Sequence, residues 1–582
     1  MNVIYNDILK IIIENKCKNQ REIVEASGYS LGKVNESVNY LIDNGYLNRD
    51  LSVSPKTIKL IDTSKPRNAI ILAAGYGMRM IPINNEVPKG LLEVRGETLI
   101  ERLINQLHEI DIKNIYVVVG FMKESYEYLI DKYGVKLIFN PLYSKHNNLY
   151  SLYCVSDYIN NSYIIPCDVW SENNPFSTFE FNSWYMMTDE LTLDSEFKIN
   201  KKRVVSHISS NIKGNKIIGI SYINDNDSNV IRKKLQQYVK TEKYDNAFWE
   251  ECFIVDKIFL LPAKIVSSKK VFEINTIENL RDLDENSINL DSEIINCASK
   301  ALNVSPKDIK NISALKKGMT NKSFIFTCNG EKYIFRIPGK GTEQLINRNE
   351  EYDVYNQINK YNICDEIIYI NPENGYKISK YICDSRTCDS NNWDDVRRCI
   401  EKLRSFHKLG LKVNHSFDLF ELIDYYEKLR NCESVYRDYN ATKQGVLTLK
   451  NYINKHKAEF VLTHIDAVPD NFLFSNDEVR LIDWEYAGMQ DPHVDLAMFA
   501  VYSYYDKKQI DKLIDLYFDN QCTRENRIKI YCYIAVCGLL WSNWCEYKLT
   551  LGVEFGEYSI KQYRYAKDFL KISREEIGEL DA

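Results

Sequence analysis

The sequence predicts a chain of three domains with different fold classes: a small α+β domain, an α/β domain with a mostly parallel sheet, and a second α+β domain. Three observations support this prediction. The 582 residues are too many for a single hydrophobic core. Short apolar runs alternate with amphipathic runs through the middle of the chain, and apolar strands joined by acidic loops follow them. We place the domains at residues 1–65, 66–295 and 296–582.

The composition is that of a globular protein, with 45% hydrophobic and 27% charged residues. A formal net charge of −6 gives no general attraction to nucleic acid or to an anionic membrane. The first residues lack a basic region followed by a cleavage site, and we expect no membrane-spanning segment. The 15 cysteines show no paired metal-binding spacing, which favours reduced thiols. We therefore expect a cytoplasmic protein that does not bind membranes.

The first domain is expected to contain helices at Tyr5–Asn15, Gln20–Ser27 and Ser30–Asn44, because apolar residues recur there at helical spacing and Ser30 can cap the third helix. Two β-like pieces, Tyr46–Arg49 and Thr57–Ile61, follow. This order resembles a winged helix-turn-helix domain.

Two functions remain open for that domain: DNA binding through the third helix, or docking and regulation. Residues 1–65 hold nine Lys and Arg against eight Asp and Glu. This near balance is weak support for a surface that contacts phosphates.

The central domain begins with an apolar strand, Ala69–Ala74, followed by a glycine-rich turn. Gly75 and Gly77 allow the backbone to turn sharply and its N–H groups to approach a phosphate. Arg79 and Lys89 add positive charge, which a triphosphate needs as the bond to its departing diphosphate breaks. The turn therefore predicts an anion site.

The string from Leu72 to Arg79, followed by Val87-Pro-Lys89, resembles the signature of nucleotidyltransferases that activate sugar phosphates or phosphocholine. Met78 departs from the usual Thr or Ser. The resemblance implies a Rossmann-like fold, Arg79 and Lys89 as catalytic residues, and a nucleotide cradle made by Leu72, Ala73, Ala74, Gly75 and Gly77.

Helices and strands are expected to alternate after this loop, at Glu97–Glu109, Ile115–Val119, Met122–Lys132, Val135–Phe139, Leu149–Asp157 and Ser162–Pro166. Such alternation predicts a mostly parallel sheet whose ligands bind at the carboxyl ends of the strands.

The same resemblance implies roles for residues farther along the chain. Asp168 and Glu273 would bind Mg²⁺, while Tyr143, Trp249 and Glu250 would contact the acceptor. Asn275 stands where the family usually has a carboxylate. The implied reaction is attack by the phosphate of phosphocholine on the α-phosphorus of CTP, which releases pyrophosphate.

The last domain opens with a hairpin whose turn bears glycine and hydroxyl groups. Thr320, Asn321 and Ser323 on this turn are expected to contact a nucleotide, and the next strand presents Arg336 to its phosphates. A helix follows in which Glu351 can pair with Arg336, as kinases pair a strand cation with a helix glutamate.

Two loops, His464-Ile-Asp-Ala-Val-Pro-Asp-Asn471 and Leu481-Ile-Asp-Trp-Glu-Tyr486, resemble the catalytic and metal-binding loops of small-molecule kinases that include choline kinases and aminoglycoside phosphotransferases. The resemblance implies a protein-kinase-like fold that uses ATP. It makes Asp466 the base and Asn471 and Asp483 the Mg²⁺ ligands, with the loop braced by His464 and Asp495.

Aromatic residues near this loop suggest the acceptor. Trp484, Glu485 and Tyr486 follow Asp483, while Trp541 and Trp544 share one face of a helical stretch. Aromatic faces beside a carboxylate suit a quaternary ammonium ion. Such a stripe is more often core, but choline kinases place a Trp pair and an acidic residue similarly.

The two resemblances together imply consecutive reactions, from choline through phosphocholine to CDP-choline, with the product serving choline decoration of cell-surface glycans. One alternative is another amino alcohol such as ethanolamine, and a second is a sugar kinase joined to a sugar-phosphate nucleotidyltransferase. An alternative of another class is a transcriptional regulator that senses ligands.

Overall fold

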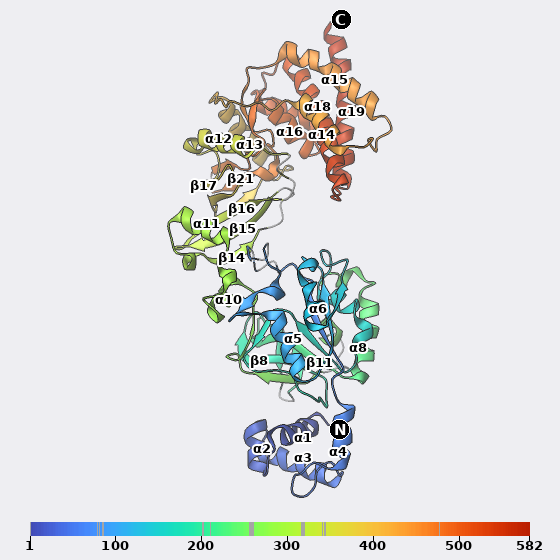
Figure 1. Cartoon of the computed structure of the whole chain (residues 1–582). Helices are drawn as coiled ribbons and strands as arrows, with labels where there is room; N and C mark the ends of the chain where they lie inside the picture. The colour runs from blue at the N-terminus through green and yellow to red at the C-terminus, as the bar shows by residue number, and fades with distance from the viewer. Residues whose placement is uncertain are drawn as a thin grey trace. The chain divides into compact units, whose positions relative to one another are not determined.

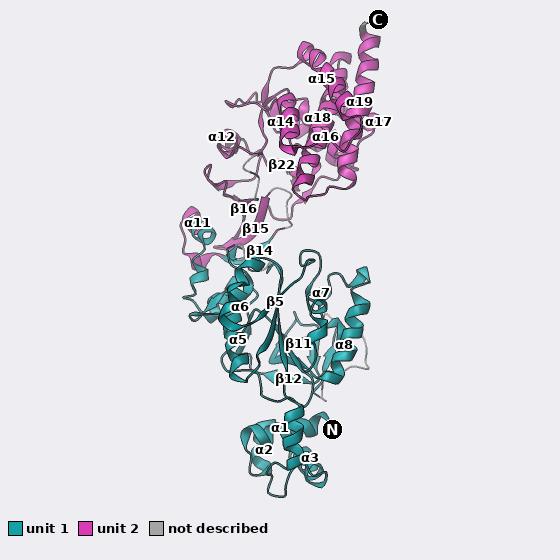
Figure 2. Ribbon diagram, turned by 45° about the vertical axis from the view of Figure 1, so that its right-hand side comes forward, with its two compact units in different colours: residues 1–297, 310–314 teal, residues 298–309, 315–582 magenta. Residues whose placement is uncertain are grey.

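The computed structural model describes residues 2–77, 80, 82–83, 86–200, 203–209, 211–254, 261–315, 321–339, 342, 345–476 and 478–581. The chain forms two compact units, residues 1–297 with 310–314 and residues 298–309 with 315–582 (Figure 2). The boundaries that the sequence suggests at residues 65 and 295 remain predictions.

The first unit begins with a helical domain that has its own small core (Figure 1). Its helices are α1 (Val3–Asn15), α2 (Gln20–Ser27), α3 (Leu31–Asp43) and α4 (Pro55–Thr63). The prediction of a β-piece at Thr57–Ile61 was wrong, because α4 covers it: Ser54 caps this helix and Pro55 occupies its first turn. Strand pairing among the described residues of this domain is one bridge, between Leu47 and Val53. Whether the domain is a winged helix remains a prediction.

Polar contacts join the helical domain to the rest of its unit. The Lys10 ammonium lies 2.5 Å from a carboxylate oxygen of Glu180, whose side chain is 2% exposed. Arg203 donates a hydrogen bond of 3.1 Å to the carbonyl of Ser27. The side chain of Phe181 packs against the helical core. The domain is therefore docked on its neighbour by charged, polar and apolar contacts.

The remainder of the first unit is built on a seven-stranded sheet with the order β12-β8-β11-β6-β1-β4-β5. These strands are β1 (Asn68–Ala73), β4 (Asn114–Val119), β5 (Lys136–Phe139), β6 (Ser162–Pro166), β8 (Trp184–Thr192), β11 (Gly214–Ile223) and β12 (Ala263–Val266). β1 pairs in parallel with β4 and β6, β4 with β5, and β12 with β8, whereas β11 is antiparallel to both its neighbours. The predicted mostly parallel sheet is confirmed.

Apolar cores lie on both faces of this sheet because alternate residues of β1 point to opposite sides: Ala69, Ile71 and Ala73 join one core, and Ile70 and Leu72 the other. The covering helices are α5 (Leu99–Glu109), α6 (Tyr128–Tyr133), α7 (Asn148–Tyr153), α8 (Asp225–Tyr238) and α9 (Glu251–Ile254). Smaller elements complete the unit: β2 (Glu93–Val94), β3 (Glu97–Thr98), β7 (Val169–Ser171), β9 (Phe197–Ile199), β10 (Val205–His207), β13 (Val271–Glu273), α10 (Ile277–Leu283) and β14 (Lys310–Ala314).

The second unit joins an antiparallel sheet to a large helical part (Figure 1). Within this unit the sheet has the order β15-β16-β18-β17, with β15 (Asn321–Cys328), β16 (Glu331–Pro338), β17 (Ile367–Ile370) and β18 (Lys377–Lys380). Short strands β19 (Arg386–Thr387), β20 (Val461–Thr463), β21 (Phe472–Ser475), β22 (Glu478–Leu481) and β23 (Gly488–Gln490) frame the predicted catalytic loops. The helices are α12 (Arg348–Ile358), α13 (Trp393–His407), α14 (Leu419–Arg430), α15 (Tyr439–His456), α16 (Val494–Tyr502), α17 (Lys507–Tyr517), α18 (Arg524–Thr550) and α19 (Glu557–Asp581), while α11 (Glu293–Leu302) crosses the boundary between the units.

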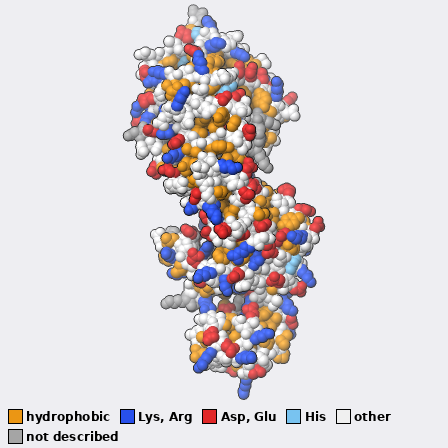
Figure 3. Space-filling view, turned by 60° about the vertical axis from the view of Figure 1, so that its left-hand side comes forward, with side chains coloured by type: hydrophobic (Ala, Val, Ile, Leu, Met, Phe, Trp, Pro, Cys, Tyr) orange, Lys and Arg blue, Asp and Glu red, His pale blue; other side chains and the backbone are white. Residues whose placement is uncertain are grey.

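Helix α18 runs through the core of the second unit. By length and composition alone it could cross a membrane, but its most apolar window is 100% buried inside the protein. The visible surface intersperses Lys and Arg with Asp and Glu (Figure 3). That face therefore carries no extended surface of one sign.

Candidate active sites

The glycine-rich turn lies at the carboxyl end of β1, where parallel strands leave space for a ligand. Gly77 has a φ of +61°, a left-handed conformation that side chains disfavour. A Cβ at Gly77 would lie 3.5 Å from Cβ of Lys89, so the lysine side chain runs alongside the turn. Leu72, Ala73 and Ala74 are buried beneath it. Arg79 lies outside the described residues.

The side chains of Lys89, Asp168 and Asn275 meet beyond this turn. The Lys89 ammonium forms an ion pair with Asp168 and donates a hydrogen bond of 2.7 Å to Oδ1 of Asn275. The other carboxylate oxygen of Asp168 is buried and has no hydrogen-bond partner among the described residues. One acceptor of Asp168 is therefore available to a cation in addition to Lys89.

Glu273 lies close enough for its charge to interact with that of Asp168. Burial and the charge of Asp168 raise the pKa of Glu273 to about 7, which marks a carboxyl group short of compensating positive charge. Asp168 and Glu273 thus fit the preference of Mg²⁺ for carboxylate oxygens. A compact group of three His, Cys, Asp or Glu side chains suited to a metal is absent from the described residues.

Glu250 and Trp249 differ in their surroundings. Oε1 of Glu250 accepts a hydrogen bond of 2.8 Å from the Tyr185 hydroxyl, Oε2 has no partner among the described residues, and burial raises the pKa of this carboxyl to about 7. Trp249 is 1% exposed and packs against Tyr185 and Phe253. Glu250 therefore has an oxygen free for a ligand, whereas Trp249 contributes mainly to the core.

The second site is formed by the two loops of the last domain. The Asn471 amide donates hydrogen bonds to the carbonyl of Asp466 at 2.9 Å and to its carboxylate at 3.1 Å. Burial, then the charges of Asp483 and Glu485, raise the pKa of Asp466 to about 7. The structure thus brings together Asp466, Asn471 and Asp483, whose crowded negative charge and oxygen ligands fit Mg²⁺.

Asp495 fixes the backbone of the Asp466 loop by accepting its hydrogen bonds. It accepts backbone hydrogen bonds from His464 at 3.1 Å and Ile465 at 2.7 Å, and a ring nitrogen of His407 lies 2.9 Å from it. Ile465 needs this support because its φ is +70°, a strained value for a β-branched residue. Burial lowers the pKa of His464 to about 4, so this imidazole is neutral near pH 7.

Arg336 on β16 and Glu351 on α12 form a buried ion pair, in which Nη2 of Arg336 lies 2.8 Å from Oε2 of Glu351. Arg348 lies 2.7 Å from Glu351 and 3.3 Å from Glu485. The Asn321 amide donates to Glu485 at 2.9 Å. Glu485 is thus already bound to protein donors.

The predicted nucleotide turn is only partly described. Thr320 lies outside the described residues, and Ser323 pairs with Arg336 across the β15–β16 ladder. Sequence reasoning missed Arg348, although its position three residues before Glu351 places both side chains on the same helix face.

The predicted acceptor aromatics separate into two groups. The Trp541 ring lies 5.9 Å from Tyr486 and 5.7 Å from Trp544, both edge-on. Trp484 is completely buried against Phe406 and His464, contrary to its predicted place in the substrate pocket. It supports the catalytic loop instead, because its indole N–H donates to the Leu481 carbonyl at 2.7 Å.

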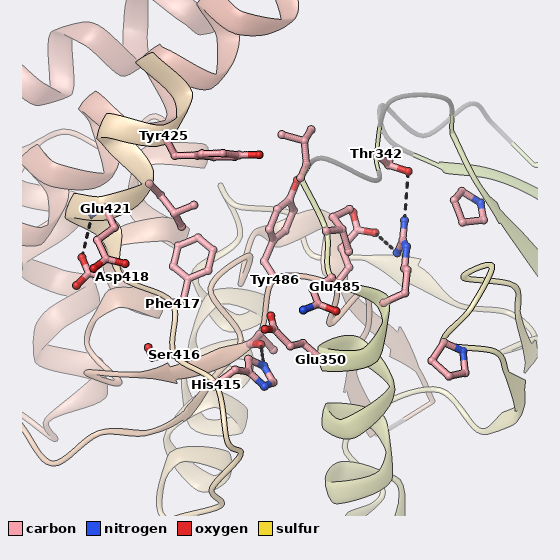
Figure 4. A pocket seen from close by; sticks show the side chains of 18 of the residues that line it. Thr342, Glu350, His415, Ser416, Phe417, Asp418, Glu421, Tyr425, Glu485 and Tyr486 are labelled. Carbon is pink, nitrogen blue, oxygen red and sulfur yellow. Dashed lines mark hydrogen bonds and ion pairs between the residues drawn. The ribbon is translucent and has the colours of Figure 1, made fainter. Parts of the chain in front are cut away.

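Tyr486 lines a cavity of about 1260 Å³, whereas Trp541 and Trp544 are buried behind it and are not among the lining residues. Figure 4 shows Tyr486 between Phe417 and Glu485. Acidic residues Glu350, Asp418 and Glu421 also line it. The cavity thus combines aromatic and acidic side chains, a pairing suited to an organic cation.

Comparisons with known proteins match the two halves of the chain to two different families, and each half contains one of the two candidate sites. A family model described as choline/ethanolamine kinase matches residues 312–563, and one described as MobA-like NTP transferase domain matches residues 69–170. Choline-phosphate cytidylyltransferase of Streptococcus pneumoniae is 31% identical over 222 residues, which are 37% of this chain and 96% of that protein. Protein LicA of Haemophilus influenzae is 28% identical over 263 residues, 42% of this chain and 96% of that protein. The crystal structure of choline kinase LicA from Streptococcus pneumoniae is 28% identical and gives a TM-score of 0.43, covering 48% of this chain and 99% of that one.

Proposed function

We propose that this chain, which belongs to the choline-phosphate cytidylyltransferase family, makes CDP-choline in two successive reactions. The kinase half phosphorylates choline with ATP, and the cytidylyltransferase half transfers CMP from CTP to phosphocholine and releases pyrophosphate. One observation carries this proposal: a single chain holds both the Lys89–Asp168 cluster and the Asp466–Asn471 cluster. The product of the first reaction is the substrate of the second.

In the kinase reaction, Asp466 accepts the proton of the choline hydroxyl as the oxygen attacks the γ-phosphorus of ATP, and the bond from that phosphorus to the departing ADP breaks. The hydrogen bond from Asn471 fixes the Asp466 carboxylate in position. Arg336, held by Glu351, supplies positive charge to the nucleotide phosphates. Choline is held by cation–π attraction to Tyr486, Trp541 and Trp544.

In the cytidylyl reaction, an already ionised phosphate oxygen attacks the α-phosphorus of CTP, so the step needs little help from a base. The Gly75–Gly77 turn cradles the phosphates, and Lys89 neutralises charge that develops on them. Glu250, whose Oε2 has no hydrogen-bond partner among the described residues, would attract the ammonium end of phosphocholine.

Both reactions require positive charge beyond these side chains. Asp168 and Glu273 would hold Mg²⁺ in the first unit, and Asn471 and Asp483 would hold it in the second. When bound, Mg²⁺ neutralises phosphate charge and orients the phosphate chain.

The helical domain is proposed to be a docking module. Its contacts with Glu180, Phe181 and Arg203 support this role, and the Lys33 ammonium on α3 is already hydrogen-bonded to Glu36 at 3.2 Å. DNA binding through α3 is the alternative, and a mobility shift with duplex DNA at moderate salt would support it if the shift disappeared in a Lys33→Ala/Arg49→Ala variant.

The proposed reactions can be tested by incubating the protein with Mg²⁺, ATP, CTP and choline and identifying products by mass. Phosphocholine should appear first and CDP-choline second, with pyrophosphate. Parallel reactions with ethanolamine and with hexoses test the alternative acceptors. Ligand binding without turnover of any alcohol would favour a sensing protein instead.

A further inference from the structure

Three aromatic side chains gather beside the phosphate-binding turn, and one of them is Tyr143, the predicted acceptor contact. The Tyr76 ring lies 4.9 Å from the ring of Phe121 and 5.2 Å from that of Tyr143, tilted by 40° and 43°. All three side chains are half-buried, so their rings are partly accessible to a ligand.

The fold builds this cluster from three neighbouring strands. Tyr76 follows β1, Phe121 follows β4 and Tyr143 follows β5, and these strands are adjacent and parallel. The Phe121 N–H donates a hydrogen bond of 3.1 Å to the Ala74 carbonyl, which ties the ends of β4 and β1 together. The cluster therefore lies at the edge of the sheet where this fold binds ligands.

Gly120 makes the close approach possible. A Cβ at this position would lie 2.6 Å from Cβ of Tyr143 and 2.7 Å from the Ala74 carbonyl oxygen. Both distances are too short for real atoms, so only glycine lets Tyr143 lie over the end of β1. Burial, and then a hydrogen bond with Tyr143, raise the pKa of Tyr76.

Two ligands could use an aromatic surface here: the ammonium group of the acceptor or the base of the nucleotide. The Lys89 side chain passes along the same turn and would repel an ammonium ion. The carboxylates that could attract one, Glu250 and Glu273, are associated with Tyr185 and Asp168. A neutral, planar base meets no such repulsion.

We propose that Tyr76 and Phe121, with Tyr143, form the surface on which the pyrimidine base of CTP stacks. Tyr76 lies between the two glycines that cradle the phosphates, which places its ring within a nucleoside's length of them. This inference rests on the proposed cytidylyltransferase function and extends it to the recognition of the base.

Tyr76→Ala tests the proposal, and binding is measured by calorimetry with CTP and, separately, with tripolyphosphate, each with Mg²⁺ and without an acceptor. Loss of base stacking should weaken CTP binding by about ten-fold or more and leave tripolyphosphate binding unchanged. Tyr76→Phe keeps the ring and should bind CTP like the wild type. Tyr76→Leu keeps apolar volume without the ring and should behave like Tyr76→Ala.

Tyr158→Ala is the matched control. This half-exposed ring stacks on Tyr116 at 4.0 Å, and the Tyr158 carbonyl contacts Asn68 at the opposite end of β1. The Tyr158→Ala substitution should leave CTP binding unchanged.

Different results would overturn the assignment in different ways. An increase in the KM for phosphocholine with unchanged CTP binding would place the ammonium on the rings. Equal weakening of CTP and tripolyphosphate would show that Tyr76 only shapes the loop. Failure of the wild type to turn over phosphocholine while it still binds CTP would refute the proposed function without affecting this test.

Discussion

Asn275 accepts a hydrogen bond from the Lys89 ammonium at 2.7 Å, although these residues are 186 positions apart. The amide oxygen thus positions the lysine without adding negative charge. A carboxylate in the same place would add a third acidic group beside Asp168 and Glu273.

Asn275→Asp should therefore lower, several-fold, the Mg²⁺ concentration that gives half-maximal cytidylyl transfer, because added negative charge favours the divalent ion. Initial rates measured over a Mg²⁺ titration check this. The Mg²⁺ dependence of the kinase reaction is the internal control and should not change. An unchanged or higher requirement would show that position 275 does not face the metal.

The two activities should separate by mutation. Asp466→Ala should reduce choline phosphorylation by about a hundred-fold or more, because the base is lost, yet leave the conversion of supplied phosphocholine intact. Lys89→Ala should do the reverse. Assays of each half-reaction check this, and loss of both activities in either folded variant would contradict the two-site assignment.

Trp541→Ala should raise the KM for choline by about ten-fold and leave the KM for ATP nearly unchanged, since it removes cation–π attraction at the ammonium group. Choline should also be preferred to ethanolamine, whose N–H groups lose hydration against an aromatic wall. Trp393→Ala, a tryptophan stacked on Tyr505 instead, is the control. Equal kcat/KM for the two alcohols would show that these aromatic side chains do not form the acceptor site.

The stability of the second unit should depend on acid pH through Glu351. Burial would raise the pKa of this carboxyl, but Arg336, Lys377 and Arg348 lower it from 4.5 to about 2. Because the folded-state pKa is depressed, the stabilisation is present above about pH 4.5 and is lost as the pH falls towards 2.

Glu351→Gln should cost about 3 kcal/mol of unfolding free energy at neutral pH, because it leaves Arg336 buried without its partner. The difference from wild type should shrink as the pH falls below 4.5. Urea unfolding at several pH values checks this. If the difference in unfolding free energy between wild type and Glu351→Gln does not vary with pH, the Arg336–Glu351 ion pair is not the source of the lost stability.

A chain that begins at Pro66 should keep both activities, since every catalytic candidate lies beyond the helical domain. Its melting temperature should fall, because Glu180 and Phe181 lose their contacts with Lys10 and the helical core. Calorimetry and both assays check this. Loss of turnover in a folded truncation would assign the helical domain a part in catalysis.

Much of the architecture could be predicted because periodicity and the glycine-rich turn are local signals. The error at Thr57–Ile61 shows their limit: five residues suit either class, and Ser54-Pro55, a helix-start signal, decides the outcome. Trp484 shows a second limit. Asp483 has a φ of +67°, and this turn places Trp484 in the core while Tyr486 lines the cavity. The local sequence does not show that Trp484 and Tyr486 point in different directions.

The sequence span of the Lys89 cluster also bears on how the protein is made. Its last member, Asn275, precedes Arg336, the first described ion-pair residue of the kinase site. Chains emerge from the ribosome at about 5–20 residues per second, and domains fold as units during synthesis. The cytidylyltransferase half can therefore assemble its site while the kinase half is still being translated. The cytidylyltransferase half would therefore fold before the kinase half. Any phosphocholine that the kinase half makes would be released when the half that uses it is already folded.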